Sequence, residues 1–164
     1  RLALVETHTD PAARPLGAKA ITDRLVALGA SLITHRHSPH READLATTLG
    51  KVSGADLILI LTASATSDPE DVAPGAVRRA GGRVDRFGMP VDPGNLLFLG
   101  SFGETPVIGL PGCVRSPALN GADWVMERLI CGIPVIAGDI AGMGVGGLLK
   151  EIPTRGRPRE AKHE

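Results

Sequence analysis

The sequence predicts a doubly wound, three-layer α/β domain in which helices cover both faces of a mostly parallel central sheet. Segments with the apolar pattern of strands alternate at least three times with segments of helical periodicity, and their connections are short. The run from Ala55 to Leu61 is rich in Leu and Ile, as expected for a strand that is buried on both faces. These observations indicate parallel strands joined by crossover helices.

The first half of the chain has two pairs of strand and helix, followed by the buried strand. Apolar residues recur every three or four positions in the first helix, and Gly29 and Gly50 stand where helix C-caps are expected. The polar segment 7–15 contains two prolines and is expected to be a loop. The expected order is strand 2–5, helix 18–28, strand 31–36, helix 42–49 and strand 55–61.

The second half is expected to add a helix, three strands and a long last helix. Ser116 suits the N-cap of that last helix and Pro117 its first position, and the apolar pattern continues to Gly132. From Thr154 onward the residues are mostly charged, Gly or Pro. The expected elements are helix 72–80, strands 84–87, 96–101 and 106–110, and the helix after Ser116. We divide the chain into a domain at 1–153 and a tail or linker at 154–164.

The composition argues against several classes of partner. The 18 basic and 18 acidic residues cancel and only 2% of the residues are aromatic, so the basic field and the stacking surfaces that nucleic acids require are missing. The sequence contains no apolar run of about 18 residues, the length that a membrane-spanning helix needs. Cys113 and Cys131 are too few for a disulfide scaffold, so we expect a reducing, cytoplasmic compartment. Because the chain opens at Arg1 without an initiator Met, we interpret it as a piece of a longer protein.

The loop after the buried strand is the first candidate for a binding site, because parallel sheets bind ligands beyond the carboxyl ends of their strands. Residues 62–71 contain four hydroxyl side chains and small residues that let backbone N–H groups approach an anion. We interpret this loop as a phosphate cradle. An equally compatible interpretation is a solvated loop in which Asp71 caps the helix that begins near Val72.

Two further loops have features of a binding site. Residues 109–116 place two glycines and the guanidinium of Arg115 at a helix start, where free N–H groups favour negative charge. Residues 88–95 are made rigid by two prolines, and Gly94 permits a turn with positive φ. Each loop alone is also compatible with an ordinary turn or connection.

Two patterns suggest chemistry that the rest of the sequence does not support. His35 and His37 share one face of a strand, but no third ligand is evident, so we interpret them and His40 as solvated side chains rather than metal ligands. Cys113 lies at a predicted helix start, but no His neighbours it in the sequence to act as a base. We therefore do not expect it to be a nucleophile.

The candidate loops match the motifs of a known family. In that family a buried strand ends in Thr-Thr-Gly-Gly-Thr-Gly and is followed by Asp-Val and a Pro; the matching residues here are Thr62, Asp71, Val72 and Pro74. Its Leu-Pro-Gly loop with a later Ser is similar to residues 110–116, and its Lys-Pro-Gly-Lys-Pro loop is similar to 92–95. On these motifs the chain, over roughly residues 1–131, resembles the molybdopterin-binding domains of molybdenum cofactor biosynthesis.

The resemblance implies a domain that binds molybdopterin or the molybdenum cofactor through its phosphate and pterin. Segments 87–95, 120–124 and 142–153 also resemble longer proteins in which such a domain precedes a nucleotidyltransferase domain, so a linked or partner nucleotidyltransferase is expected. Homo-oligomers are common in the family. The residues expected to contact the ligand are Thr62, Ala63, Ser64, Thr66, Ser67, Asp71, Pro93, Gly94, Pro111, Gly112, Cys113, Arg115 and Ser116.

Two other functions fit the same motifs. The domain would itself be an enzyme if Asp68 and Asp71 held Mg²⁺ for adenylyl or molybdate transfer. It would instead be a degenerate domain with only an assembly role if Ala63 and Ser64, which stand where the family has two glycines, blocked the ligand. Of these functions we favour binding for this domain, with nucleotidyl transfer expected of the longer protein.

Overall fold

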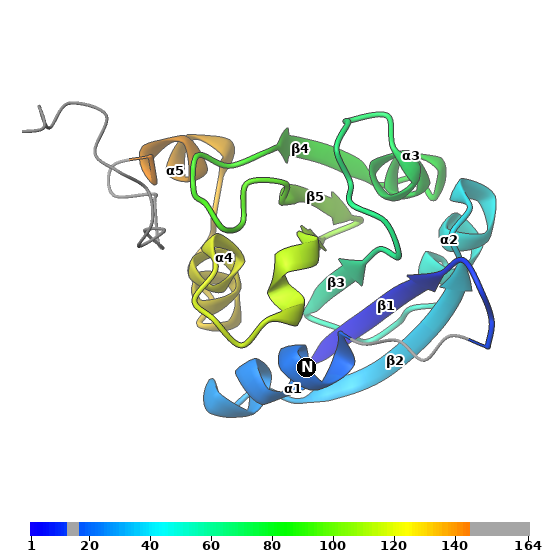
Figure 1. Ribbon diagram of the computed structural model, residues 1–164, viewed down its shortest axis with the longest axis horizontal. Helices are drawn as coiled ribbons and strands as arrows, with labels where there is room; N and C mark the ends of the chain where they lie inside the picture. Colours follow the sequence, from blue (N-terminus) through cyan, green and yellow to red (C-terminus); the bar gives the residue numbers. More distant parts are fainter. Residues whose placement is uncertain (13–16, 145–164) are drawn as a thin grey trace, which may run out of the picture.

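A computed structural model describes residues 1–12 and 17–144 of the chain. The predicted end of the domain at 145–153 and the tail at 154–164 lie outside the described residues. Within them, helices flank a six-stranded sheet (Figure 1). The elements are β1 (Leu2–His8), α1 (Ala18–Ala27), β2 (Leu32–Pro39), α2 (Glu42–Leu49), β3 (Leu57–Leu61), α3 (Val72–Arg79), β4 (Arg83–Phe87), β5 (Phe98–Phe102), β6 (Thr105–Leu110), the 3-10 turn η1 (Gly112–Arg115), α4 (Gly121–Ile130) and α5 (Ala137–Gly142).

The sheet has the strand order β2-β1-β3-β6-β5-β4. The strands β2, β1, β3 and β6 run parallel, and β5 is antiparallel to both of its neighbours. The predicted doubly wound and mostly parallel sheet is therefore confirmed. From β1 the chain passes outward to β2, and from β2 it crosses back past β1 to β3. The loops after β1 and β3 therefore lead to helices on opposite faces of the sheet, and between them lies the crevice in which such sheets bind ligands.

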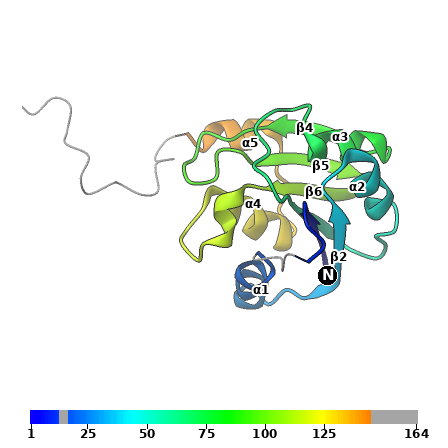
Figure 2. The same cartoon turned by 45° about the vertical axis from the view of Figure 1, so that its right-hand side comes forward.

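The core has one apolar layer on each face of the sheet. Successive side chains of a strand point to opposite faces. Leu2 and Leu4 of β1 pack against α1, α4 and α5, whereas Ala3 and Val5 pack against α2 and α3. Figure 2 shows α1 and α4 on one side of the sheet and α2 and α3 on the other. This three-layer core gives the loops at the carboxyl ends of the strands a rigid base.

The last long helix begins later than the sequence predicts. The prediction that Ser116 is its N-cap is wrong, because Ser116 is extended and α4 begins at Gly121. The N-cap is Asn120, whose side chain accepts from the Ala122 N–H, while the Asp123 carboxylate accepts from the Asn120 N–H. This complete capping box satisfies two of the backbone donors that every helix start leaves unpaired.

The other predicted elements are present, with ends that shift by up to three residues. β2 continues to Pro39 because its ladder with β1 continues to His8. The short helix α5, which the sequence did not predict, buries Ile140 in the α1 and α4 layer. No helix in the described part of the chain has the length and apolar character needed to cross a membrane.

Candidate functional site

The loop after β3 is shaped by two buried hydroxyl groups. Thr62 Oγ1 donates to the carbonyl oxygen of Ser64 at 2.6 Å, and it lies 3.2 Å from Thr66 Oγ1. Because the Thr62 proton is committed to Ser64, the Thr66 hydroxyl is the donor of the second bond. Both threonines are buried, whereas Ala63, Ser64 and Ser67 are exposed. The two threonines therefore hold the loop in shape, and the exposed residues form its outer surface.

His40, which follows β2, connects β1 to this loop. The N–H of Ala63 donates to Thr7 Oγ1 at 2.8 Å, and Thr7 Oγ1 lies 2.9 Å from His40 Nδ1. Since the buried Thr7 hydroxyl needs an acceptor for its own proton, it donates to His40 Nδ1. The ring proton is then on Nε2, which lies 2.8 Å from Ser64 Oγ and donates to it. This order of donors leaves the hydroxyl hydrogen of Ser64 available to a ligand.

The electrostatics of His40 fit this arrangement. Burial lowers the pKa of the His40 imidazole, and the nearby Asp71 carboxylate partly opposes that shift. The ring is therefore neutral near pH 7, as an acceptor at Nδ1 and a donor at Nε2 require.

Asp71 is bound to its own loop. Its Oδ2 accepts from the N–H groups of Ser67 at 2.7 Å and Asp68 at 3.0 Å, while Asp68 Oδ1 accepts from the Glu70 N–H at 2.7 Å. Asp71 occupies the N-cap position of α3, but its side chain makes no capping bond to the first turn. The N–H groups of Ser67 and Asp68, which the phosphate-cradle interpretation would use, thus bind a carboxylate of the chain itself.

Arg115 joins the loop after β6 to the loop after β3. Its Nη2 donates to the Thr62 carbonyl oxygen at 2.7 Å, and its Nη1 lies 3.4 Å from the Gly112 carbonyl oxygen. Arg115 makes no ion pair within the part of the chain that the structure describes. The N–H groups of Gly112 and Cys113 begin the 3-10 turn, so that turn offers them no acceptor. An uncompensated positive charge and two backbone donors therefore lie together.

Asn120 joins the loop after β6 to the loop between β4 and β5. Its Nδ2 donates to Cys113 Sγ at 3.0 Å, and the carbonyl oxygen of Pro93 accepts from the Gly121 N–H at 2.8 Å. Gly94 has a φ of +129°, and a β-carbon there would lie 2.9 Å from Asn120 Oδ1. Only glycine lets the loop pack so closely. Pro93 and Gly94 therefore support the start of α4.

A hollow of about 580 Å³ lies between α1 and the loop after β6. Three cationic side chains line it, those of Lys19, Arg24 and Arg115, together with Ala20, Asp23, Ala27 and Pro117. Lys19 pairs with Asp23 at 2.6 Å in an exposed ion pair, which water weakens. The hollow is therefore positively charged on the side where Arg115 reaches the loop after β3.

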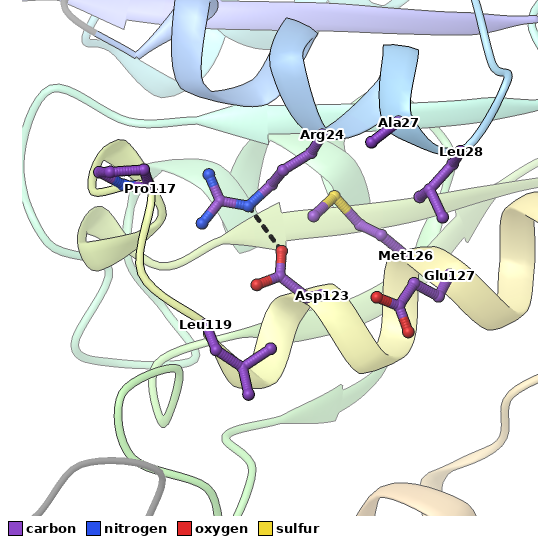
Figure 3. Close-up of a pocket in the computed structure, with 8 residues that line it drawn as sticks. All are labelled: Arg24, Ala27, Leu28, Pro117, Leu119, Asp123, Met126 and Glu127. Atoms are coloured by element: carbon purple, nitrogen blue, oxygen red, sulfur yellow. Dashed lines mark hydrogen bonds and ion pairs between the residues drawn. The ribbon is translucent and has the colours of Figure 1, made fainter.

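A second hollow, of about 300 Å³, continues from the first and shares Arg24, Ala27 and Pro117 with it (Figure 3). Here Arg24 of α1 points at Asp123 of α4, with Nε and Oδ1 2.6 Å apart and each side chain 12% exposed. The remaining guanidinium N–H groups of Arg24 donate to the carbonyl oxygens of Ala20, Val114, Ser116 and Ala118. Arg24 is thus fully used in positioning the loop after β6.

The structure brings the three predicted loops together at one edge of the sheet. The predicted residues that act as supports are Thr62, Thr66, Asp71, Pro93, Gly94 and the buried Pro111; Ser116 Oγ accepts from the Ala118 N–H. The sequence analysis missed Thr7, Lys19, Arg24, His40 and Asn120. Of these, only Asn120 had a local signal, since Asp123 follows at the capping-box spacing. The others depend on partners that are distant in the sequence.

The structure adds a third residue beside His35 and His37, which are both exposed, as the sequence analysis expected. The sequence showed no third ligand for them, but Glu6 of β1 lies beside both, and the three side chains form a group that could hold a metal ion. His35 is exposed and at the same time bonded to the buried Glu6. The sequence alone does not give the register of β1 against β2 that brings them together. The expectation that His40 is a solvated side chain is wrong, because both of its ring nitrogens are bonded.

The chain is similar to known proteins in its structure. No protein-family model and no curated protein matches the sequence. The molybdopterin biosynthesis MoeA protein from Pyrococcus horikosii matches with a TM-score of 0.61 and 19% identity, over 86% of this chain and 36% of that protein. The molybdopterin biosynthesis enzyme MoaB from Thermus thermophilus matches with a TM-score of 0.51 and 16% identity, over 91% of this chain and 98% of that enzyme. The chain has the fold of these molybdopterin biosynthesis proteins.

The likeness to these two structures confirms the fold that the resemblance of the loop motifs implied. The chain spans about a third of the length of the Pyrococcus protein and nearly the whole length of the Thermus enzyme. In this chain the charged hollow and the linked loops after β3 and β6 lie at the same edge of the sheet.

Proposed function

We propose that this domain binds molybdopterin or the molybdenum cofactor and acts in molybdenum cofactor biosynthesis. The observation that supports this function most directly is the convergence of the loops after β3 and β6 beside a cationic hollow, at the edge where doubly wound sheets bind ligands. The likeness of the fold to the molybdopterin biosynthesis proteins MoeA and MoaB supports molybdopterin as the ligand.

The residues at this edge fit such a ligand in size and charge. Binding sites for small molecules commonly have volumes of about 300–1,000 Å³, and the hollow has about 580 Å³. Arg115 and Lys19 supply positive charge for the phosphate, and the N–H groups of Gly112 and Cys113 supply donors. Ser64 supplies the hydroxyl hydrogen that the His40 arrangement leaves free. These donors suit the oxygen atoms of the phosphate and the pterin.

Binding is better supported than Mg²⁺-dependent transfer. In a transferase, Asp68 and Asp71 would supply carboxylate oxygens to Mg²⁺. Here Asp71 Oδ2 accepts from two N–H groups and Asp68 Oδ1 from another, so each carboxylate already holds the loop in place. The same proposal includes a longer protein with a nucleotidyltransferase domain, to which this domain would present the cofactor. It also includes a cytoplasmic location and the formation of homo-oligomers.

Isothermal titration calorimetry of the protein with molybdopterin tests this function. We expect one site per chain with a micromolar dissociation constant. Ser64→Ala removes the free hydroxyl and should weaken binding about 2- to 10-fold, the usual effect of one hydrogen bond. Ser53→Ala is the matched control, because Ser53 is an exposed serine in the connection between α2 and β3, at the opposite edge of the sheet.

The Ser64→Gly variant separates the two ways in which the titration could fail. If the wild-type protein gives no heat but Ser64→Gly binds, the site exists and the serine side chain blocks it. If neither protein binds, the proposed function is wrong.

A further inference from the structure

The two histidines of β2 face a carboxylate of β1. In the parallel ladder Glu6 pairs with His37, and Leu4 pairs with His35. Paired residues of neighbouring strands point to the same face of a sheet. Glu6, His35 and His37 therefore lie on the α1 side, whereas Thr7 points to the opposite side, toward His40 and the loop after β3. None of the three residues lines the charged hollow or belongs to the loops of the proposed pterin site.

The three side chains are close enough to reach one metal ion after a small movement. The ligand atoms of Glu6, His35 and His37 all lie within 4.8 Å of one another, and His35 Nε2 is 2.6 Å from Glu6 Oε2. Bonds from Zn²⁺ to imidazole nitrogen and carboxylate oxygen are about 2.0–2.2 Å long, so two ligand atoms on one ion are at most about 4.4 Å apart. A rotation of the exposed His37 side chain supplies the small adjustment.

The carboxylate of this group is buried beside the start of α1. Glu6 is 2% exposed, and a β-carbon at Gly17 would lie only 3.0 Å from Glu6 Oε1. A buried carboxylate needs a cation or donors to balance its charge. Two residues further along the same face of β1, His8 has a buried Nδ1 with no hydrogen-bond partner among the described residues. Besides the nitrogen of His35 that is bonded to Glu6, a second imidazole nitrogen, that of His8, therefore lies on this face of β1.

We propose that Glu6, His35 and His37 bind a divalent transition-metal ion of the zinc class. Two imidazoles and one carboxylate are a ligand set that Zn²⁺ accepts, whereas Mg²⁺ prefers oxygen ligands alone. Three protein ligands leave at least one coordination position for water, and the exposed His37 keeps that position open to solvent. The ion would neutralise Glu6 and fix the edge strand β2 to β1.

Titration of the chelator-treated full chain with Zn²⁺, followed by calorimetry, tests the site. We expect one ion per chain with a dissociation constant in the micromolar range or below. His37→Ala should weaken binding at least 10-fold, and the fold should be retained, because the His37 side chain is exposed and the hydrogen bond of Glu6 goes to His35 instead. Arg36→Ala is the matched control, since Arg36 is an exposed residue of the same strand whose side chain points to the other face.

Cobalt gives a second readout that does not depend on heat. Co²⁺ bound by His35, His37 and Glu6 should show visible d–d absorption, which His37→Ala alters and Arg36→Ala does not. The proposal is wrong if the wild-type chain binds no stoichiometric Zn²⁺. It is also wrong if His37→Ala binds Zn²⁺ as tightly as the wild type, because the ion would then be held elsewhere, for example by the exposed thiols of Cys113 and Cys131.

Discussion

His40 makes the stability of the domain depend on pH. Its imidazole is neutral in the folded protein, since burial lowers its pKa below the unfolded value of about 6.5. Below that pH the unfolded chain binds more protons than the folded chain, so the free energy of unfolding falls as the pH falls. Protonation of Nδ1 would also remove the acceptor that the buried Thr7 hydroxyl uses.

We therefore predict that His40→Gln is less stable than the wild type at pH 7.5 but loses less stability between pH 7.5 and 5.5. Urea unfolding in the presence of a chelator, at three pH values across this range, measures the slope. Ser53→Ala should retain the wild-type slope. Equal slopes for His40→Gln and the wild type would show that His40 is not the group that titrates.

Individual site residues could be predicted only where their partners are close in the sequence. The hydroxyl-rich loop 62–71 was recognised from its composition, and it does lie at the carboxyl edge of the sheet. Its pairing with Thr7 and His40 could not be foreseen, because these residues are separated from it by more than 20 positions. Glu6 was missed as a neighbour of His35 for the same reason. The sequence shows which residues could do chemistry, but not which of them meet.

At the scale of elements, Arg24 connects α1, α4 and the loop after β6. Its ion pair with Asp123 is nearly buried, and four carbonyl oxygens accept from its other N–H groups. Removing one partner of a buried pair leaves the other charge uncompensated and typically costs about 3–5 kcal/mol. The carbonyl oxygens of Ser116 and Ala118 would also lose their donor.

We predict that Arg24→Ala lowers the free energy of unfolding by about 3 kcal/mol or more. Arg24→Lys should recover only part of this loss, because an ammonium group cannot reproduce the planar set of five donors. Urea unfolding gives both values. The control is Arg128→Ala on the exposed face of α4, for which we expect a change within about 0.5 kcal/mol. A loss for Arg24→Ala as small as that of the control would contradict the prediction.

The same contacts explain why the start of α4 was predicted wrongly. Ser116 and Pro117 have the sequence of a helix start. Arg24, however, binds the carbonyl oxygens of Ser116 and Ala118 in an extended loop, and Asn120 offers a complete capping box four residues later. A tertiary contact about 90 residues away thus overrides a local signal. The helices and strands with strong apolar periodicity depend on no such contact, and they were predicted to within three residues.

At the scale of the whole molecule, the strand order determines where a ligand can bind. Alternating strands and helices predict a parallel sheet, but they do not specify which strands are neighbours. In the observed order β3 lies between β1 and β6, so the loops after all three strands reach one edge. A ligand held by these loops would connect both apolar layers of the core. It would bind the folded chain but not the unfolded chain, in which the loops are apart.

Ligand binding should therefore raise the stability of the entire domain. At a molybdopterin concentration 100 times the dissociation constant, linkage predicts about 2.7 kcal/mol of added stability. For a chain of this size that corresponds to a rise in Tm of about 5–10 °C. Differential scanning calorimetry with and without ligand measures the shift. The physical reason is that the unfolded chain brings none of the loop donors or cations together.

Two exposed lysines distinguish ligand binding in the hollow from a general effect of charge. Lys19→Ala removes a cation that lines the hollow and should reduce the rise in Tm at the same ligand concentration. Lys51→Ala should not, because Lys51 is an exposed residue at the opposite edge of the sheet, between α2 and β3. Equal shifts for the two variants would place the ligand outside the hollow. No shift in any protein, together with a stable dimer in analytical ultracentrifugation, would favour a domain whose role is assembly, because a degenerate site adds no stability however much ligand is present.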